Sequence, residues 1–267
     1  MIVITGINGF IASHLSKRLE NVIGITKEQS QNMTSLLEYY KPEYIYHIGA
    51  ELYDQDKMFD SNILLTYQIL EYCRNANNLK RLIIFGSSSE YGRKDNPISE
   101  KDSLEPYTIY EGTKSAASLL SQSYSYTYNI PIFIIRPFTI YGPGEKPNKF
   151  LHVLFRKKQN QDKHISISEG VHDYVYIDDF INALLNIVQT NQEQFDIINI
   201  GSGIQTTNRE VVYLFEKVTN YKFDTYSSIE KKVYDSDNWV CNPEKVNKYY
   251  KIQISLEEGI LKMNSLL

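Results

Sequence analysis

The chain has few potential metal ligands and no long apolar run. Its 267 residues include five histidines and two cysteines, Cys73 and Cys241. Their spacings match neither a disulfide framework nor a zinc site, so the sequence predicts no metal centre. No stretch reaches the roughly 18 apolar residues that a membrane-spanning helix needs. Met1–Gly6 has no basic leader and is too short for a signal peptide, so we expect a cytoplasmic protein with no membrane partner.

A strong charge of either sign is also missing. The chain carries 28 lysine and arginine residues against 32 aspartate and glutamate residues, a formal net charge of -4. Because there is no long basic run, nucleic-acid binding has no electrostatic support. The hydrophobic fraction of 42% is sufficient for one large domain or two closely associated lobes. The composition therefore favours a globular protein without a nucleic-acid partner.

Short β-branched segments alternate with helical patterns along the first half of the chain. The predicted strands are Ile2–Ile4, Val22–Thr26, Tyr44–Ile48, Leu82–Phe85 and Ile132–Arg136, and the predicted helices are Phe10–Leu19, Asn62–Asn75 and Glu111–Tyr128. Apolar strands separated by helices are typical of a parallel sheet covered on both faces. The sequence thus predicts an α/β fold, a Rossmann-type doubly wound parallel sheet. Residues 28–42 are interpreted as a short connection.

The alternation loosens after Tyr141-Gly142-Pro143-Gly144. The later patterns predict helices over Phe150–Lys157 and Asn208–Thr219, with strands near Ile165–Ser168, Val175–Ile177 and Ile197–Ile200. We expect a dinucleotide-binding lobe of residues 1–145 with return segments at about 171–203. A smaller C-terminal substrate lobe would comprise residues 146–170 and 204–267.

A glycine-containing turn follows the first predicted strand, Thr5-Gly6-Ile7-Asn8-Gly9-Phe10-Ile11-Ala12. Gly6 permits a tight turn, and Gly9 lets the backbone approach a pyrophosphate. The helix that begins there offers free N–H groups to the phosphates. An ordinary strand–helix turn is the alternative. Its place in a βαβ unit favours dinucleotide binding, with cofactor contacts at Gly6, Asn8, Gly9, Phe10 and Ile11.

The end of the second predicted strand bears on the choice of cofactor. NAD sites usually place an acid there, which accepts from the ribose hydroxyls. This sequence has Thr26 and Lys27 instead. A hydroxyl beside a cation suits a 2′-phosphate, so the pair predicts NADP, with NAD as the alternative. Lys27 as a solvated surface residue is the other interpretation.

The spacing Tyr-x-x-x-Lys puts a phenol and an ammonium group on one face of a helix, where the cation favours the phenolate. It occurs three times, as Tyr53/Lys57, Tyr110/Lys114 and Tyr213/Lys217. Tyr110/Lys114 lies between the fourth and fifth predicted strands. Its helix begins near the carboxyl edge of the sheet, where doubly wound folds bind ligands. The sequence therefore favours Tyr110 and Lys114 as the reactive pair.

Several of these segments together resemble the extended short-chain dehydrogenases/reductases, the sugar-nucleotide epimerases, dehydratases and reductases. The resemblance lies in the glycine turn through His14-Leu15, in Pro106-Tyr107 before the Tyr110 motif, and in Arg136–Pro143. It implies a homodimer that acts on a sugar nucleotide.

The resemblance also implies roles for individual residues. Tyr110 would be the general acid or base, and Lys114 would lower its pKa and bind the nicotinamide ribose. Ser88 would hold the reacting oxygen, with Ser87 and Ser89 as alternatives. Asn62, in Asn62-x-x-x-Thr66, would order the lysine through water. Further cofactor contacts are implied at Ile48, Gly49, Ala50 and Pro137, and substrate contacts at Ser89, Glu90, Thr139, Lys149 and His172.

The chain departs from the family pattern at three positions. Ala12 replaces the third glycine, Thr139 an asparagine and His172 an arginine that often binds substrate phosphate. Lys146, Lys149 and Arg156 are candidates for the replacement charge.

Three reactions use this machinery: reduction of a nucleotide-linked 4-keto-6-deoxy sugar, 4-epimerisation and 4,6-dehydration. The dehydratases carry Asp-Glu directly after the active Ser or Thr, whereas this chain has Ser89-Glu90. The short 28–42 connection and Thr26-Lys27 resemble NADP-using reductases. We therefore expect a reductase first, with an NAD-dependent 4-epimerase as the close alternative. A dehydratase or a non-catalytic dinucleotide sensor is less favoured.

Overall fold

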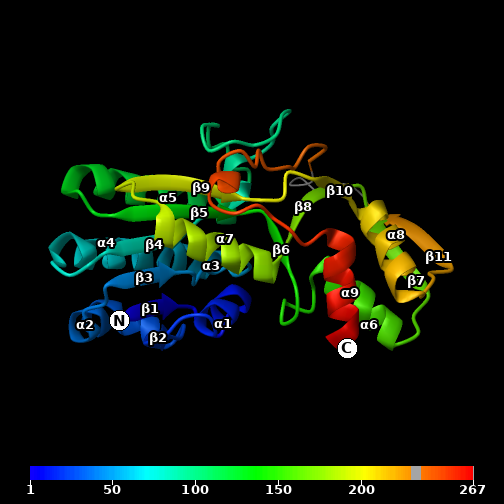
Figure 1. Cartoon of the computed structure of the whole chain (residues 1–267), viewed down its shortest axis with the longest axis horizontal. Coiled ribbons are helices and arrows are strands. Elements are labelled where there is room, and N and C mark those ends of the chain that lie inside the picture. The colour runs from blue at the N-terminus through cyan, green and yellow to red at the C-terminus, as the bar shows by residue number, and fades with distance from the viewer. Residues whose placement is uncertain (230–235, 267) are drawn as a thin grey trace. The chain divides into compact units, whose positions relative to one another are not determined.

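The structure is a computed structural model that describes residues 1–229 and 236–266. It divides into two compact units (Figure 1). Unit 1 comprises Met1–Gly92, Glu100–Pro137 and Leu184–Asn199. Unit 2 comprises Arg93–Ser99, Phe138–Ala183 and Ile200–Leu267. The predicted substrate lobe, residues 146–170 and 204–267, falls within unit 2, and its residues 230–235 and 267 lie outside the described residues.

Unit 1 contains a six-stranded sheet, which confirms the predicted Rossmann-type fold. Its strands are β1 (Ile2–Thr5), β2 (Val22–Ile25), β3 (Tyr44–His47), β4 (Arg81–Phe85), β5 (Ile132–Pro137) and β9 (Phe195–Ile200). They lie in the order β2-β1-β3-β4-β5-β9, and the first five run parallel. The order reverses between β1 and β3. Doubly wound sheets bind ligands at such a switch point, outside the carboxyl ends of the strands.

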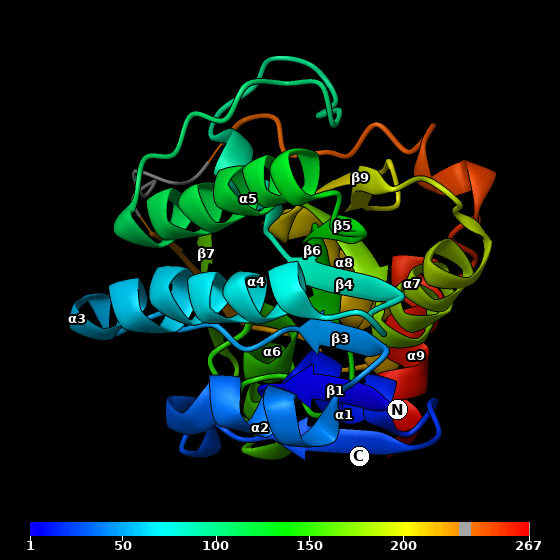
Figure 2. The same cartoon turned by 90° about the vertical axis from the view of Figure 1, so that its left-hand side faces the viewer.

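The helices of unit 1 include α1 (Phe10–Ser16), α2 (Met33–Tyr40), α4 (Leu65–Asn75) and α5 (Ile109–Tyr128). In Figure 2, α2, α4 and α5 lie on the side of the sheet that faces the viewer. Helix α5 begins with a capping box, in which the Thr108 side chain accepts from the Glu111 N–H and the Glu111 carboxylate accepts from the Thr108 N–H. This cap fixes the first turn of α5, which carries Tyr110.

The segment 28–42, predicted as a short connection, contains secondary structure that the sequence analysis did not predict. It forms a 3-10 turn, Gln29–Asn32, followed by α2. Met33 and Leu37 are four residues apart, so they share one face of the helix and are buried against the sheet. Leu37 is only one residue beyond the first turn, so the apolar stripe is too short to stand out in the sequence.

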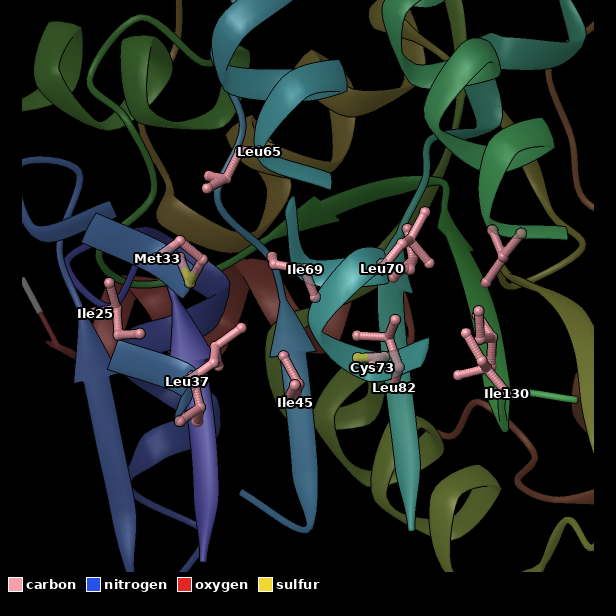
Figure 3. Close-up of a cluster of buried hydrophobic side chains, with 14 residues drawn as sticks. Ile25, Met33, Leu37, Ile45, Leu65, Ile69, Leu70, Cys73, Leu82 and Ile130 are labelled. Atoms are coloured by element: carbon pink, nitrogen blue, oxygen red, sulfur yellow. The ribbon is translucent and has the colours of Figure 1, made fainter. Parts of the chain in front are cut away.

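A cluster of 14 buried side chains holds α2 and α4 on the sheet (Figure 3). Figure 3 labels Ile25, Met33, Leu37, Ile45, Leu65, Ile69, Leu70, Cys73, Leu82 and Ile130. Fully burying one such aliphatic side chain stabilises the fold by about 1.5–3 kcal/mol. The cluster thereby fixes the strands whose carboxyl ends carry the candidate site.

Unit 2 contains two small sheets. One has the order β10-β8-β6, formed by β6 (Thr139–Tyr141), β8 (Val171–Tyr176) and β10 (Gln205–Thr207), and the other pairs β7 (His164–Ser168) with β11 (Thr225–Ile229). Its helices are α6 (Phe150–Gln159), α8 (Asn208–Thr219) and α9 (Leu256–Leu266), and α7 (Ile177–Thr190) begins here. Of the two predicted return strands, β9 joins the large sheet, but β8 pairs with β6 and β10 instead.

Asp173 on β8 organises the centre of unit 2. Its carboxylate is fully buried and accepts from the Ser202 N–H and hydroxyl, the Gly203 N–H and the Cys241 N–H at 2.6–3.0 Å. These bonds satisfy a carboxylate that would otherwise be costly to bury. They also fix the loop after β9 against the strand that carries His172.

Candidate active site

The glycine turn lies at the switch point between β1 and β3. Gly6 has a φ of +67°, and a Cβ at this position would lie 2.7 Å from Gly49 Cα. Only glycine therefore lets the ends of β1 and β3 approach so closely. Gly9 is the N-cap of α1 and has no side-chain cap, so its helix end retains N–H groups suited to phosphate oxygens. The predicted contacts from Gly6 to Ile11, and Ile48 to Ala50, thus lie on two neighbouring loops that fit a dinucleotide.

His47 connects these loops, a role that the sequence did not suggest. One ring nitrogen, Nδ1, is 2.8 Å from Thr5 Oγ1, and the other, Nε2, is 3.1 Å from Thr66 Oγ1. Burial, with the nearby charge of Lys114, lowers the pKa of His47 to about 3. The neutral ring therefore acts as a fixed hydrogen-bonding link between β1, β3 and α4.

Lys27 follows the edge strand β2 and is ion-paired. Its Nζ lies 2.7 Å from Glu51 Oε2. The other carboxylate oxygen of Glu51 accepts from the N–H groups of Leu52, Tyr53 and Asp54 at 3.1–3.3 Å. The hydrogen bond from Lys27 and those from the Tyr53 and Asp54 N–H groups lower the pKa of Glu51 to about 2, against the effect of burial. The structure thus brings the predicted cofactor residue Lys27 to an acid that sequence reasoning missed.

Tyr110 lies in the first turn of α5, and a side-chain hydrogen bond with Ser87, one of the two alternatives to Ser88, acts to lower the pKa of its phenol. Ser87 is the N-cap of a 3-10 turn, Ser88–Tyr91, that begins right after β4 and Gly86. The Ser87 hydroxyl is also 2.7 Å from Ser89 Oγ. The serine that meets Tyr110 is therefore the first of the run of three.

Lys114 follows Tyr110 by one helical turn and is almost completely buried. Its ammonium group donates to the Phe85 carbonyl at the end of β4. Burial lowers the pKa of Lys114 to about 8. Burial also raises the pKa of Tyr110 to about 12, against the lowering effect of the Ser87 hydrogen bond. The expected lowering of the Tyr110 pKa by Lys114 is therefore not found here, because desolvation of the phenol dominates.

The other two Tyr-x-x-x-Lys pairs have a different environment. Lys57 is ion-paired with Asp54, and Lys217 with Glu257, and both lysine side chains are more than half exposed. Lys114 is 5% exposed. Of the three motifs, Tyr110/Lys114 thus has the buried lysine, which agrees with its choice as the reactive pair.

Asn62 lies in a π-helical turn, Phe59–Leu64, before α4. Its amide donates to Thr113 Oγ1 at 2.9 Å and to the Glu51 carbonyl at 3.0 Å, and its oxygen accepts from the Glu51 N–H at 2.8 Å. Thr113 precedes Lys114 in α5. Asn62 therefore connects the loop after β3 to the helix that carries the reactive pair.

Glu90 is fully buried in unit 1, so it does not fit the predicted role of a substrate contact. One oxygen accepts from the Ser87 N–H at 2.8 Å, and the other accepts from Arg136 Nε at 2.9 Å. Arg136 also donates to the Tyr91 hydroxyl, which donates to Asn199. Burial raises the pKa of Glu90, against the opposing charges of Arg136 and Lys114. Glu90 thus fixes the backbone of Ser87 through a hydrogen bond inside the protein.

The remaining predicted substrate residues lie in unit 2. Thr139 on β6 and His172 on β8 are brought together, with 3.5 Å between Thr139 Oγ1 and His172 Nδ1. Lys149 is exposed at the N-cap of α6. Lys149 acts on the neighbouring Glu145, where burial raises the pKa to about 8 and the lysine charge opposes the rise. Pro137 ends β5 in unit 1.

Metal-ligand clusters, reactive cysteines and membrane-spanning helices would each indicate a further kind of function. Within residues 1–229 and 236–266, no three His, Cys, Asp or Glu side chains are arranged to hold a metal ion. Cys73 and Cys241 are buried free thiols, and burial raises the pKa of Cys73. In the same described ranges, no helix combines the length and the apolar character needed to cross a membrane.

Comparisons with known proteins identify the family of the chain. The model of the "NAD dependent epimerase/dehydratase family" matches residues 2–201. The chain is 26% identical to the "Uncharacterized UDP-glucose epimerase YtcB" of Bacillus subtilis, over 97% of this chain and 95% of the relative. It is 27% identical to the UDP-glucuronate 4-epimerase of Thermodesulfobacterium geofontis, over 86% and 74%. The crystal structure of the Bacillus cereus UDP-glucuronic acid 4-epimerase, in complex with UDP-glucuronic acid and NAD, aligns with a TM-score of 0.89 at 25% identity, covering 99% of this chain and 98% of that one.

Proposed function

The chain belongs to the NAD-dependent epimerase/dehydratase family of extended short-chain dehydrogenases/reductases, and from this premise we propose that it is an NAD-dependent 4-epimerase of a UDP-linked sugar. The observation that carries the proposal is that Ser87 and the Phe85 carbonyl bound by Lys114 lie at the carboxyl end of β4, on the same edge of the parallel sheet as the glycine turn after β1. The relatives that match over most of the chain include proteins named as a UDP-glucose epimerase and as UDP-glucuronate 4-epimerases, which supports the same substrate class.

The reductase expected from the sequence had two supports, and one of them is weakened by an ion pair. The first was Lys27 as a free cation for a 2′-phosphate, but Lys27 is paired with Glu51. The second was the short connection of residues 28–42, which contains α2 but is no longer for it. The solved relative contains NAD. We therefore propose NAD rather than NADP as the cofactor.

A dehydratase is disfavoured by the residues after Ser87. Elimination of water requires an acid and a base beside the active serine or threonine. Because Ser87 meets Tyr110, the two positions that follow it are Ser88 and Ser89, both hydroxyls. Glu90 comes next, but its carboxylate is buried and paired with Arg136. The acid–base pair of a dehydratase is thus missing from this run.

The proposed mechanism assigns one proton transfer to the chain. NAD, when bound, would supply the acceptor and later the donor of the electron pair at C4 of the sugar. Tyr110 would take the proton of the C4 hydroxyl through its phenolic oxygen. It would return this proton after the oxidised sugar has rotated and presented its opposite face to the cofactor. Ser87, hydrogen-bonded to Tyr110, would hold the same oxygen. Lys114 would act by position: its ammonium group donates to the Phe85 carbonyl and so holds the start of α5, which carries Tyr110, against the end of β4.

Other residues would bind without reacting. The turn from Gly6 to Ile11 would hold the diphosphate of NAD. The close approach of the Gly6 and Gly49 backbones brings this turn against the loop after β3. Thr139 and His172, side by side in unit 2, are the proposed contacts to the sugar nucleotide, together with Lys149. We also propose a homodimer formed through the exposed apolar side chains of α4 and α5.

Product analysis tests the proposal. The purified protein with NAD should interconvert UDP-glucuronate and UDP-galacturonate, or UDP-glucose and UDP-galactose, as followed by chromatography. No net change in the absorbance of reduced nicotinamide should accompany the conversion. Consumption of NADPH with a nucleotide-linked 4-keto-6-deoxyhexose, without interconversion of either epimer pair, would establish the reductase instead.

A further inference from the structure

The adenosine end of the cofactor site has an unusual charge arrangement. In dinucleotide folds the residue at the carboxyl end of β2 faces the ribose 2′ position, where an acid selects NAD and a nearby cation accommodates a 2′-phosphate. Here Thr26 and Lys27 follow β2, which is the edge strand of the sheet. Thr26 accepts from the Gln29 N–H through its hydroxyl and has no charge. Lys27 alone would therefore predict NADP.

Glu51 changes the charge of this end of the site. It follows β3, on the far side of β1 from Lys27, and its side chain is 15% exposed. One carboxylate oxygen is held by three backbone N–H groups. The backbone of Glu51 is held on both sides by Asn62, at 2.8 and 3.0 Å. The position of Glu51 is thus fixed by the N–H groups of its own loop and by Asn62 in the π-helical turn before α4.

Lys27 is the adaptable partner of the pair. Its side chain is 63% exposed, and its ammonium group reaches across the end of β1 to Glu51 Oε2 at 2.7 Å. At this distance the two charges largely cancel for a third group nearby. A 2′-phosphate beside Lys27 would also lie close to a carboxylate that cannot move away. Glu28, next to Lys27 in the chain, adds a second negative charge at this end.

We infer that the Lys27–Glu51 ion pair determines the cofactor preference of the enzyme. Glu51 neutralises Lys27, the cation that would otherwise bind a 2′-phosphate, and its own charge repels that phosphate, so the site selects NAD. Glu51 thereby does from the end of β3 what an acid usually does from the end of β2. The inference rests on the proposed NAD-dependent function, but it concerns binding alone.

The test is titration calorimetry of the full chain with NAD and with NADP, at one salt concentration and without sugar nucleotide. The unmodified protein should bind NAD at least about tenfold more tightly, or about 1.4 kcal/mol. Glu51→Gln keeps an acceptor oxygen for the three N–H groups but removes the charge, so NADP affinity should rise about tenfold. NAD affinity should change less than about twofold. Glu43→Gln is the matched control, since it removes an ion pair with Lys80 at the amino end of β3 and should leave the ratio unchanged.

Two results would overturn the inference: an unmodified protein that binds NADP as tightly as NAD, or a Glu51→Gln protein with an unaltered ratio. If Glu51→Gln fails to fold, Lys27→Met tests the same pair without touching the Glu51 loop. It leaves the carboxylate unpaired, so NADP binding should weaken further while NAD binding persists, and a gain in NADP affinity would contradict the inference. Absence of epimerase activity in the unmodified protein, together with the expected shift of the binding ratio in the Glu51→Gln variant, would refute the proposed function and leave this inference standing.

Discussion

Glu90 and Arg136 form a buried ion pair, with 2.9 Å between Glu90 Oε2 and Arg136 Nε and side chains that are 0% and 3% exposed. The pair joins the turn after β4 to β5. Because the second oxygen of Glu90 accepts from the Ser87 N–H, the same carboxylate also fixes the serine that meets Tyr110. The Glu90 carboxylate therefore contributes both to the stability of unit 1 and to the geometry of the candidate site.

We expect Glu90→Ala to lower the free energy of unfolding by about 3–5 kcal/mol, since it leaves the Arg136 charge buried without its partner. Urea denaturation measures this loss. Glu43→Ala removes an exposed ion pair with Lys80 and should cost about 0–1 kcal/mol. Equal losses in the two variants would show that the buried pair has no special weight.

Tyr110→Phe should lower turnover of the sugar nucleotide by roughly 10²–10⁴-fold, because it removes the proton carrier and keeps the ring. Binding of NAD, measured by calorimetry, should change little. Tyr53→Phe and Tyr213→Phe are matched controls from the motifs whose lysines are exposed, and both should retain nearly full turnover. Loss of activity in either control, with Tyr110→Phe active, would mean that the wrong motif was chosen.

The structure makes the choice between two neighbouring serines testable. Ser87 is hydrogen-bonded to Tyr110, whereas Ser88 lies within the 3-10 turn that follows. Ser87→Ala should therefore lower kcat by about 10²-fold, the lower end of the range for acid–base groups. Ser88→Ala should leave kcat within a few-fold of the unmodified enzyme. The reverse order in steady-state assays would restore the original prediction of Ser88.

Local patterns were sufficient for much of this site. The parallel strands, the glycine turn and Tyr110/Lys114 all depend on residues close together in the chain. The structure confirms the parallel sheet, and the cofactor and catalytic roles of the turn and of Tyr110/Lys114 stay predictions. Which of three serines meets Tyr110 depends on where β4 ends and the next turn begins, a boundary that sequence patterns locate only to within a few residues.

The missed contacts involve residues far apart in the sequence. Lys27 and Glu51 meet because the sheet order puts β2 and β3 on either side of β1. Glu90 was predicted as a substrate contact, but it is buried and accepts a hydrogen bond from Arg136, 46 residues later in the chain. No periodicity reports such pairs, since each depends on the tertiary fold.

The proposed homodimer predicts a surface on α4 and α5. Tyr67 on α4 is 43% exposed, and Leu119 and Tyr126 on α5 are 53% and 69% exposed. Clustered apolar side chains of this kind mark association sites. Leu119→Lys should convert a dimer into a monomer in light scattering coupled to size exclusion, whereas Tyr213→Lys, an equally exposed aromatic on α8, should not. A monomeric unmodified protein would contradict the proposal.

Lys114 predicts how stability depends on pH. Burial lowers its pKa from 10.5 to about 8, so between these values the unfolded chain binds more protons than the folded one. The free energy of unfolding therefore gains from Lys114 as pH rises through this window, by up to about 1.4 kcal/mol per pH unit. Tyr110 acts in the opposite direction, but only above pH 10, because its pKa is raised from 10.0 to about 12.

The comparison of the unmodified protein with Lys114→Met isolates this effect. At pH 7 the variant should be the more stable of the two, since it no longer buries an ammonium group. Its advantage should shrink steadily as the pH is raised from 8 towards 10, where the buried lysine of the unmodified protein is neutral. Urea denaturation at intervals across this range, with Lys80→Met as the exposed-lysine control, measures the difference. A constant difference between pH 8 and 10 would show that Lys114 keeps an ordinary pKa and remains a cation throughout.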